Sequence, residues 1–323
     1  MNDLLRALGE GWQRVGSIYA RYPVRRLPSP SGVTVARVEV GSRSVVVINC
    51  HWRPYPYGPY EVQERIRAGT LPGDPSKFAA EILRASDKVD GVKGRRETLE
   101  VVRSWRRRGE TVVLTGDFNE PSHLDWTARA ARDGLDRWVS NPSATPLRFA
   151  IPWRGSRELR ALGLRDVYRD RFPNEVTHPG NTWTPRYEKE ESDRREWGEQ
   201  VLDRIDLVYV AGPGVKVIDA ARVTEAGAGG EREVGEGWPS DHYAVWGELE
   251  LTKSLPELRV FLMAGQSNME GQGVVDLDHP EHYNGGRGTL ARLLDDPELA
   301  PKLRHLRAKG DGWSARTNTS SRA

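Results

Sequence analysis

The alternation of apolar and polar residues along the chain predicts several short strands. Residues 34–40 alternate apolar with polar side chains, a Gly-Ser turn follows, and residues 43–49 form a second predicted strand, which is typical of a β-hairpin. Residues 111–114 form a continuous β-branched and apolar run, and residues 202–210 contain a similar one. Runs of this length and composition indicate buried strands.

Apolar residues that recur at helical spacing predict helices between these strands. The predicted helices are residues 3–12, 75–86, 92–108, 125–132 and 157–162. Asp74 followed by Pro75 is a typical N-cap and first turn for the second of them. The helix at 92–108 leads directly into the strand at 111–114, so the two form one helix-to-strand unit.

Two segments each allow two interpretations. Residues 52–60 are rich in proline and aromatic residues, so we expect neither a helix nor a central strand there. Their rings either pack on the core as a lid or contact a substrate, and the sequence favours neither. The arginines of residues 92–108 form either a phosphate-binding patch or a solvated helix face, and the solvated face is favoured.

The composition bounds these interpretations. The 323 residues are 37% hydrophobic and 29% charged, with a net charge of +2. This length is typical of about two domains, and the near-neutral charge neither requires nor excludes a nucleic-acid partner. No apolar run is long enough for a transmembrane helix. Cys50, the single cysteine, excludes an intrachain disulfide and a multi-cysteine metal site.

The first 20 residues lack the basic start and the apolar core of a signal peptide. We therefore find no export signal in this sequence. The location is unknown, with the cytoplasm as the default, and a longer parent protein could still be exported.

Polar residues suited to catalysis stand at the ends of the predicted strands. They are His51, Asp117, Asn119, Asp206, Asp241 and His242. Loops at the carboxyl ends of strands are where open α/β sheets bind ligands. Asp117, with Asn119 two residues later, can hold a hard cation and a phosphate oxygen side by side. The alternative is an Asx-type turn after a core strand, which needs no ligand.

In this order the strand ends resemble the endonuclease/exonuclease/phosphatase superfamily. Its signature pieces are a strand-end His, GD-x-N, R-[IL]-D and a terminal S-D-H, which correspond here to His51 and to residues 116–119, 204–206 and 240–242. The resemblance covers about residues 3–251. It implies an α/β fold of the α+β sandwich type, with mixed β-sheets flanked by helices. It also implies phosphodiesterase or phosphatase chemistry with Mg²⁺, or Mn²⁺, as the metal.

The resemblance further implies roles for individual residues. Asp241 and Asp117 would bind the metal, and Asp117 would also orient or deprotonate the nucleophile. His242 would act on the phosphate, with Asp206 orienting and charging its ring. Mg²⁺ prefers oxygen ligands, which agrees with carboxylates in the metal-binding positions.

Two more residues would contact the phosphate. Asn119 would form a hydrogen bond with it, and His51 would donate to one of its oxygens. An alternative without catalysis is that Asp203 and Asp206 pair with Arg204 or with other neighbours at a sheet edge.

The resembled superfamily begins with two strands that we do not find in this sequence. The first carries an Asn, and the second ends in Q-E, whose Glu is a principal Mg²⁺ ligand. We find no counterpart before Asp3, so we interpret residues 1–251 as a phosphohydrolase domain that lacks its first strands and is impaired by the missing Glu. An upstream coding frame with W-N and Q-E would test this.

A second resemblance follows a brief linker at residues 252–257. A predicted strand at 258–264 leads into Gly-Gln-Ser-Asn-Met-Glu-Gly, whose serine is Ser267. This resembles the nucleophile block of the sialate O-acetylesterase-like carbohydrate esterases, which share the SGNH-hydrolase fold. Residues 258–323 would be the N-terminal fragment of such an α/β domain, with Ser267 as its nucleophile. We assign no general base to it.

Three functions are therefore in competition. The first is metal-dependent hydrolysis of a phosphoester, either a small molecule or a nucleic acid. The second is hydrolysis of an acetylated carbohydrate through Ser267 in a longer parent protein. The third is an inactive fragment in which both sites are incomplete. The missing Glu separates the first from the third, and the sequence leaves the substrate and the oligomeric state open.

Overall fold

The computed structural model describes residues 3–87, 94–138, 145–183, 201–235, 238, 240–251, 297 and 300. Within these residues the strands form sheets of six, three and two strands. The predicted linker at 252–257, the predicted strand at 258–264 and Ser267 lie outside the described residues.

The largest sheet has the strand order β3-β4-β5-β6-β8-β7. Its strands are β3 (Val24–Arg26), β4 (Val33–Val40), β5 (Arg43–His51), β6 (Val112–Asp117), β8 (Asp206–Ala211) and β7 (Arg165–Asp166). β4 and β5 form the predicted hairpin, with Val40 opposite Arg43. β5 and β6 are parallel, because α-helices connect them, and the other pairs are antiparallel.

The two smaller sheets include two strands, β9 (Val215–Glu225) and β10 (Arg232–Val234), that the sequence pattern left unassigned. The three-stranded sheet consists of β10, β9 and β11 (Ala244–Leu251) in that order. The two-stranded sheet pairs β1 (Gln13–Val15) with β2 (Ile18–Ala20).

The helices mostly follow the predicted spacing. They are α1 (Asp3–Leu8), α2 (Gly58–Arg67), α3 (Pro75–Ser86), α4 (Arg95–Arg107), α5 (Ala128–Asp133), α6 (Arg154–Ala161) and α7 (Val167–Arg171). Asp74 caps α3 by accepting hydrogen bonds from two backbone N–H groups of its first turn. The first predicted helix ends early, at Leu8, and the two short ones start at Ala128 and Arg154.

One sequence interpretation was wrong and another holds only in part. We excluded a helix from residues 52–60, but α2 begins at Gly58, because Pro59 lies in the first turn, where no backbone N–H is required. The solvated face favoured for the arginines of α4 describes Arg96 and Arg107, which are exposed. Arg95 departs from it, because it is buried and pairs with Asp87 and Glu120.

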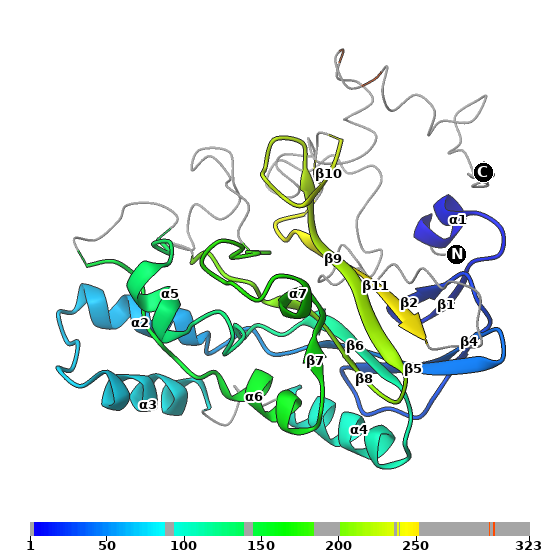
Figure 1. Ribbon diagram of the computed structural model, residues 1–323, viewed down its shortest axis with the longest axis horizontal. Coiled ribbons are helices and arrows are strands. Elements are labelled where there is room, and N and C mark those ends of the chain that lie inside the picture. The colour runs from blue at the N-terminus through cyan, green and yellow to red at the C-terminus, as the bar shows by residue number, and fades with distance from the viewer. Residues whose placement is uncertain are drawn as a thin grey trace.

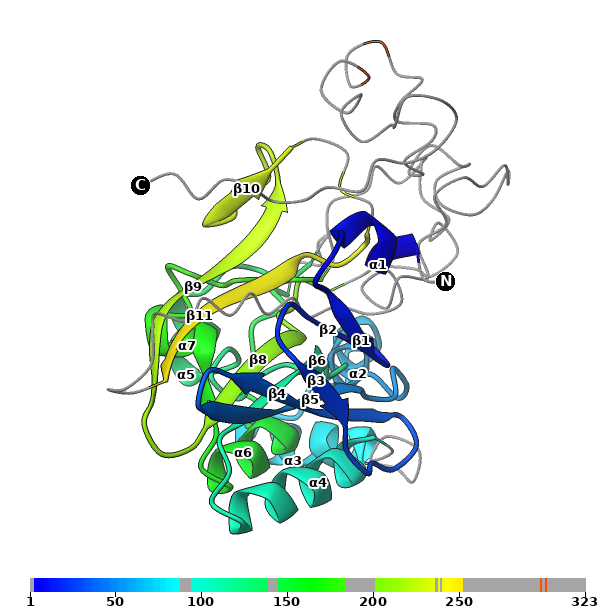
Figure 2. The same ribbon diagram turned by 90° about the vertical axis from the view of Figure 1, so that its right-hand side faces the viewer.

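The elements pack in layers. Figures 1 and 2 show α3, α4 and α6 on one side of the six-stranded sheet and β9 with β11 on the other. The core under the helices contains Ile48, Leu114 and Val102. The core between the two large sheets contains Val208 and Val245. The fold is therefore the predicted one, mixed β-sheets flanked by helices. None of the described helices is long and apolar enough to cross a membrane.

Candidate functional site

Three of the predicted site residues stand side by side on neighbouring strands. His51 on β5 is opposite Asp117 on β6, and Asp117 is opposite Asp206 on β8. Side chains alternate between the two faces of a strand, so Asp117 points to the same side as Val113. Val113 packs in the core between the two sheets. The register therefore places His51, Asp117 and Asp206 on the face of the six-stranded sheet that packs against the three-stranded sheet.

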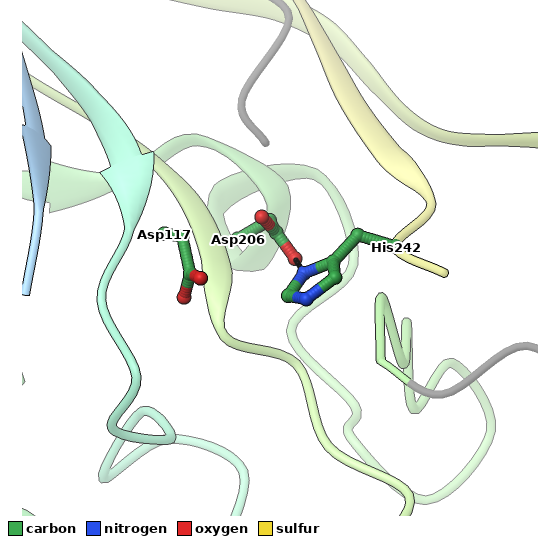
Figure 3. A group of neighbouring side chains, drawn as sticks. All are labelled: Asp117, Asp206 and His242. Atoms are coloured by element: carbon green, nitrogen blue, oxygen red, sulfur yellow. Dashed lines mark hydrogen bonds and ion pairs between the residues drawn. The ribbon is translucent and has the colours of Figure 1, made fainter. Parts of the chain in front are cut away.

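The three-stranded sheet contributes His242, which precedes β11. Its Nδ1 lies 2.8 Å from Oδ2 of Asp206, and both side chains are buried. Figure 3 shows Asp206 between Asp117 and His242, with its carboxyl group turned toward the imidazole. The other oxygen of Asp206, Oδ1, is also buried and has no hydrogen-bond partner among the described residues.

Thr182 holds the segments of Asp206 and His242 together. Its Oγ1 accepts hydrogen bonds from the backbone N–H groups of Ile205 and Asp206, each at 3.1 Å. Its carbonyl oxygen accepts one from Tyr243 N at 2.7 Å. Thr182 is not among the predicted site residues. A signal was present, since residues 180–185 resemble the G-x-T-W loop that precedes R-I-D in the endonuclease/exonuclease/phosphatase superfamily.

Asn119, in the loop after β6, binds the carboxylate of Asp117, the last residue of that strand. The backbone N–H and the side-chain amide of Asn119 donate to Asp117, at 2.9 and 3.1 Å. The amide also donates to the carbonyl oxygen of Trp52 at 2.9 Å. Asn119 has a φ of 44°, and it is the one non-glycine residue with positive φ in the described chain. The two interpretations of this loop therefore describe the same residues: Asp117 and Asn119 form an Asx-type turn and also belong to the predicted site.

The last two predicted residues border this group. Nε2 of His51 lies 3.4 Å from Oδ2 of Asp117, and the His51 side chain is 46% exposed. Oδ2 of Asp241 lies 3.7 Å from Nε2 of His242. All six predicted residues of the first resemblance therefore lie next to one another, although His51 and His242 are far apart in sequence.

Burial sets the electrostatics of the pair. Loss of hydration raises the pKa of the Asp206 carboxyl above its ordinary value. The adjacent His242 opposes this rise, and the nearby charge of Asp117 adds to it. A buried carboxylate that faces a second carboxylate requires a proton or a cation nearby.

The same residues fit a divalent cation. One ligand atom each from Asp117, Asp206 and His242 lies within 4.8 Å of the others. The unpartnered Oδ1 of Asp206 supports this, since hard cations bind carboxylate oxygens. Asp241, predicted as a ligand, is not one of these three residues.

Arg204 does not occupy the site. It forms ion pairs with Asp125 and Asp166, so the alternative that it pairs with Asp206 was wrong. Asp203 forms an ion pair with another arginine, Arg137, at 3.2 Å, and accepts hydrogen bonds from Tyr57 and Trp126, at 2.7 and 2.8 Å.

The aromatic residues 52–60 mainly pack on the core. Trp52 and Tyr57 are each 4% exposed, whereas Tyr55 is 56% exposed. Of the two interpretations of this segment, the packed one describes Trp52 and Tyr57. Tyr55 alone of these three side chains is open to a substrate.

Comparison with known proteins agrees with the order of these motifs. The model of the endonuclease/exonuclease/phosphatase family matches residues 16–242, which is more than two thirds of the chain. An uncharacterized protein of Caenorhabditis elegans, F14F9.5, is 30% identical over an alignment of 159 residues that covers 46% of this chain. The match spans 45% of that relative's length.

The solved structures that match this chain share low sequence identity and low TM-scores with it. An endonuclease/exonuclease/phosphatase from Beutenbergia cavernae is 17% identical, with a TM-score of 0.34, over 72% of this chain and 46% of that one. The 3′-5′ exonuclease NExo from Neisseria meningitidis is 19% identical, with a TM-score of 0.37, over 70% and 72%. The match to the family model decides the assignment: the chain belongs to the endonuclease/exonuclease/phosphatase family.

Proposed function

We propose that this chain is a phosphoester hydrolase that depends on Mg²⁺ or Mn²⁺. The observation that supports this most is the position of Asp117 directly opposite Asp206, beside His242. Two facing carboxylates and an imidazole suit a reaction in which negative charge must be neutralised and a proton moved. The proposed substrate is a phosphodiester or a phosphomonoester, in a small molecule or in a nucleic acid.

Asp117 would hold the metal, with Asp241 and Asp206 as its further candidate ligands. When bound, such a cation neutralises charge on the phosphate oxygens and stabilises the leaving oxygen. Asp117 also orients the attacking water or takes its proton. Its other neighbours, Asn119 and His51, fix the direction of its carboxylate.

The imidazole of His242 acts on the phosphate. Asp206 binds Nδ1 and so fixes the orientation of the ring, which leaves Nε2 as the nitrogen that faces the reaction.

Asn119 and His51 contact the phosphate on the other side. Both hydrogens of the Asn119 amide are engaged, with Trp52 O and Asp117 Oδ2. Donation to the phosphate thus requires that one of these bonds be exchanged. His51, being half exposed, reaches the phosphate from the open side.

Hydrolysis assays test this proposal. Bis(4-nitrophenyl) phosphate, 4-nitrophenyl phosphate and a DNA strand with a 3′-phosphate are each incubated with the chain, with Mn²⁺ or with a chelator. We expect slow turnover that needs the metal and is lost in Asp117→Ala, but not in Asp133→Ala, which removes an exposed carboxylate paired with Arg132. Absence of metal-dependent hydrolysis of all three substrates contradicts the proposal.

The esterase prediction for Ser267 is a second candidate that rests on sequence alone. Asp276 and His279 have the D-x-x-H spacing of the general base in that family, but they follow Ser267 by only a few residues. A serine without an oriented base is a weak nucleophile at neutral pH. We therefore expect no hydrolysis of aryl acetates above a Ser267→Ala control. Stoichiometric labelling of Ser267 by a fluorophosphonate would overturn this expectation.

A further inference from the structure

Glu120, the residue after Asn119, is a largely buried carboxylate, 12% exposed, outside the six residues of the candidate site. Its Oε1 accepts a hydrogen bond from the backbone N–H of Gly155 at 2.6 Å. Its Oε2 accepts one from Nη1 of Arg95 at 3.2 Å. Gly155 lies in the first turn of α6 and Arg95 in the first turn of α4. Glu120 therefore joins the end of the loop to the N-terminal ends of two helices.

The packing around Gly155 leaves no room for a larger residue at this position. A Cβ atom at position 155 would lie 2.4 Å from the ring of Trp52 and 2.7 Å from Oε1 of Glu120. Trp52 is also the residue whose carbonyl oxygen accepts the amide of Asn119. The α6 backbone thus packs against both Trp52 and Glu120. Trp52 binds the side chain of Asn119, and Glu120 is the next residue in the chain.

A set of charged residues surrounds Glu120. Arg95 is shared with Asp87, at 2.6 Å, and Asp87 also binds Arg154 of α6. Glu158 of α6 lies 3.7 Å from Nε of Arg95 and is half exposed. Burial raises the pKa of Glu120 to about 7, against the opposing effects of Arg95 and of the Gly155 N–H. Its carboxylate therefore gains or loses a proton near neutral pH.

We propose that Glu120 is a positioning residue that keeps Asn119 in its left-handed backbone conformation and so aligns Asn119 with Asp117. Left-handed backbone at a residue other than glycine persists where the surroundings impose it. Asn119 is followed at once by a side chain fixed at two points, and its own side chain is fixed at two more. The inference rests on the proposed phosphoester hydrolysis for its effect on catalysis, but not for its effect on the loop.

Three variants test the proposal. Glu120→Ala removes both contacts, and Glu120→Gln keeps an acceptor for Gly155 N but loses the charge opposite Arg95. Glu158→Gln is the matched control, because it makes the same chemical change at another neighbour of Arg95 that does not touch the loop. Thermal unfolding of each variant is measured alongside to show that it is folded.

The first measurement does not require activity. Hydrogen exchange of the Asn119 backbone N–H, which donates to Asp117, is compared with that of amides within β6. In Glu120→Ala we expect the Asn119 amide to exchange about tenfold faster while the β6 amides are unchanged. Glu158→Gln should match the unchanged chain. Equal exchange at Asn119 in all variants overturns the proposal, whether or not the chain hydrolyses phosphoesters.

The second measurement uses the hydrolysis assay across pH. In Glu120→Gln we expect kcat to fall on the order of tenfold with KM little changed, because a misaligned group weakens the transition state more than substrate binding. Because the ionised carboxylate of Glu120 pairs with Arg95, kcat of the unchanged chain should rise with pH around a midpoint near 7. This rise should disappear in Glu120→Gln. An unchanged kcat and pH profile contradict the proposal. If the unmodified chain shows no turnover, the proposed function fails, and the exchange result still decides the role of Glu120.

Discussion

Asp117 and Asp206 face each other directly across the antiparallel strands β6 and β8, and both side chains are buried. Like charges at directly opposite positions destabilise a sheet, and burial increases this cost. On its own, the pair of carboxylates therefore destabilises the folded chain. The pair is explained by a cation or a proton that its neighbours, above all His242, help to hold.

Metal binding should therefore stabilise the folded chain. We expect Mn²⁺ or Mg²⁺ to raise the midpoint of thermal unfolding. The free energy of unfolding should increase by about 1.4 kcal/mol when the metal is at ten times its Kd. Binding should be weak, because the cluster in the described chain offers two carboxylates and an imidazole already bonded to one of them. In Asp206→Asn the metal effect should be lost, whereas Asp219→Asn, at the surface beside Arg171, should keep it. An equal metal effect in both variants contradicts this prediction.

Replacement of His242 should remove most of the hydrolytic activity. His242→Gln eliminates the group that contacts the phosphate, and we expect kcat to fall about 10²- to 10⁴-fold. His178, which stacks on Phe172, provides the matched control, and His178→Gln should be nearly as active as the unchanged chain. Activity in His242→Gln within twofold of the control would show that this imidazole does not take part.

Thr182 should contribute stability through its hydroxyl group. Thr182→Val leaves the buried N–H groups of Ile205 and Asp206 without an acceptor, which should lower the free energy of unfolding by roughly 1–3 kcal/mol. Thr182→Ser keeps the oxygen and should lose less. Urea unfolding of the two variants measures the difference. If Thr182→Val is no more destabilising than Thr182→Ser, the two hydrogen bonds to the hydroxyl oxygen do not contribute as predicted.

Glu120 should make stability depend on pH in a defined direction. The pKa of Glu120 is about 7 in the folded chain, against an ordinary value of 4.5, so the folded state binds the proton more tightly than the unfolded state. Stability from this group is complete below pH 4.5 and is lost as the pH rises to 7, by an amount on the order of 3 kcal/mol. Glu120→Gln should flatten this part of the curve, measured by urea unfolding between pH 4.5 and 8. A curve that keeps its slope in this variant assigns the dependence to another group.

Local pattern in the sequence was sufficient for several elements. The β4–β5 hairpin follows from apolar alternation around a Gly-Ser turn, and α3 follows from the Asp74 cap and its helical periodicity. The strand β6 follows from its β-branched run, and its polar end at Asp117 identifies a loop suited to chemistry. These features depend on neighbours within a few residues, which a single sequence displays directly.

Other elements depend on partners that are distant in the chain. β9 mixes polar and apolar residues without a regular alternation, and its strand state is fixed by pairing with β11. The burial of Arg95 depends on Asp87 and Glu120, which lie on other segments. No spacing in the sequence reveals that these groups meet, so the arginine run indicated a solvated face.

The residues that stand at strand ends, and their order, can be read from the chain, because strand-forming runs and the polar residues that stop them are local properties. The position of Asp117 opposite Asp206 follows only from the folded sheet, since the register of two strands so far apart in sequence is set by how the whole sheet packs. The same holds for the bond between Asp206 and His242, which join different sheets. Side-chain contacts between sheets follow from the packing of both cores, and that packing is a property of the folded chain.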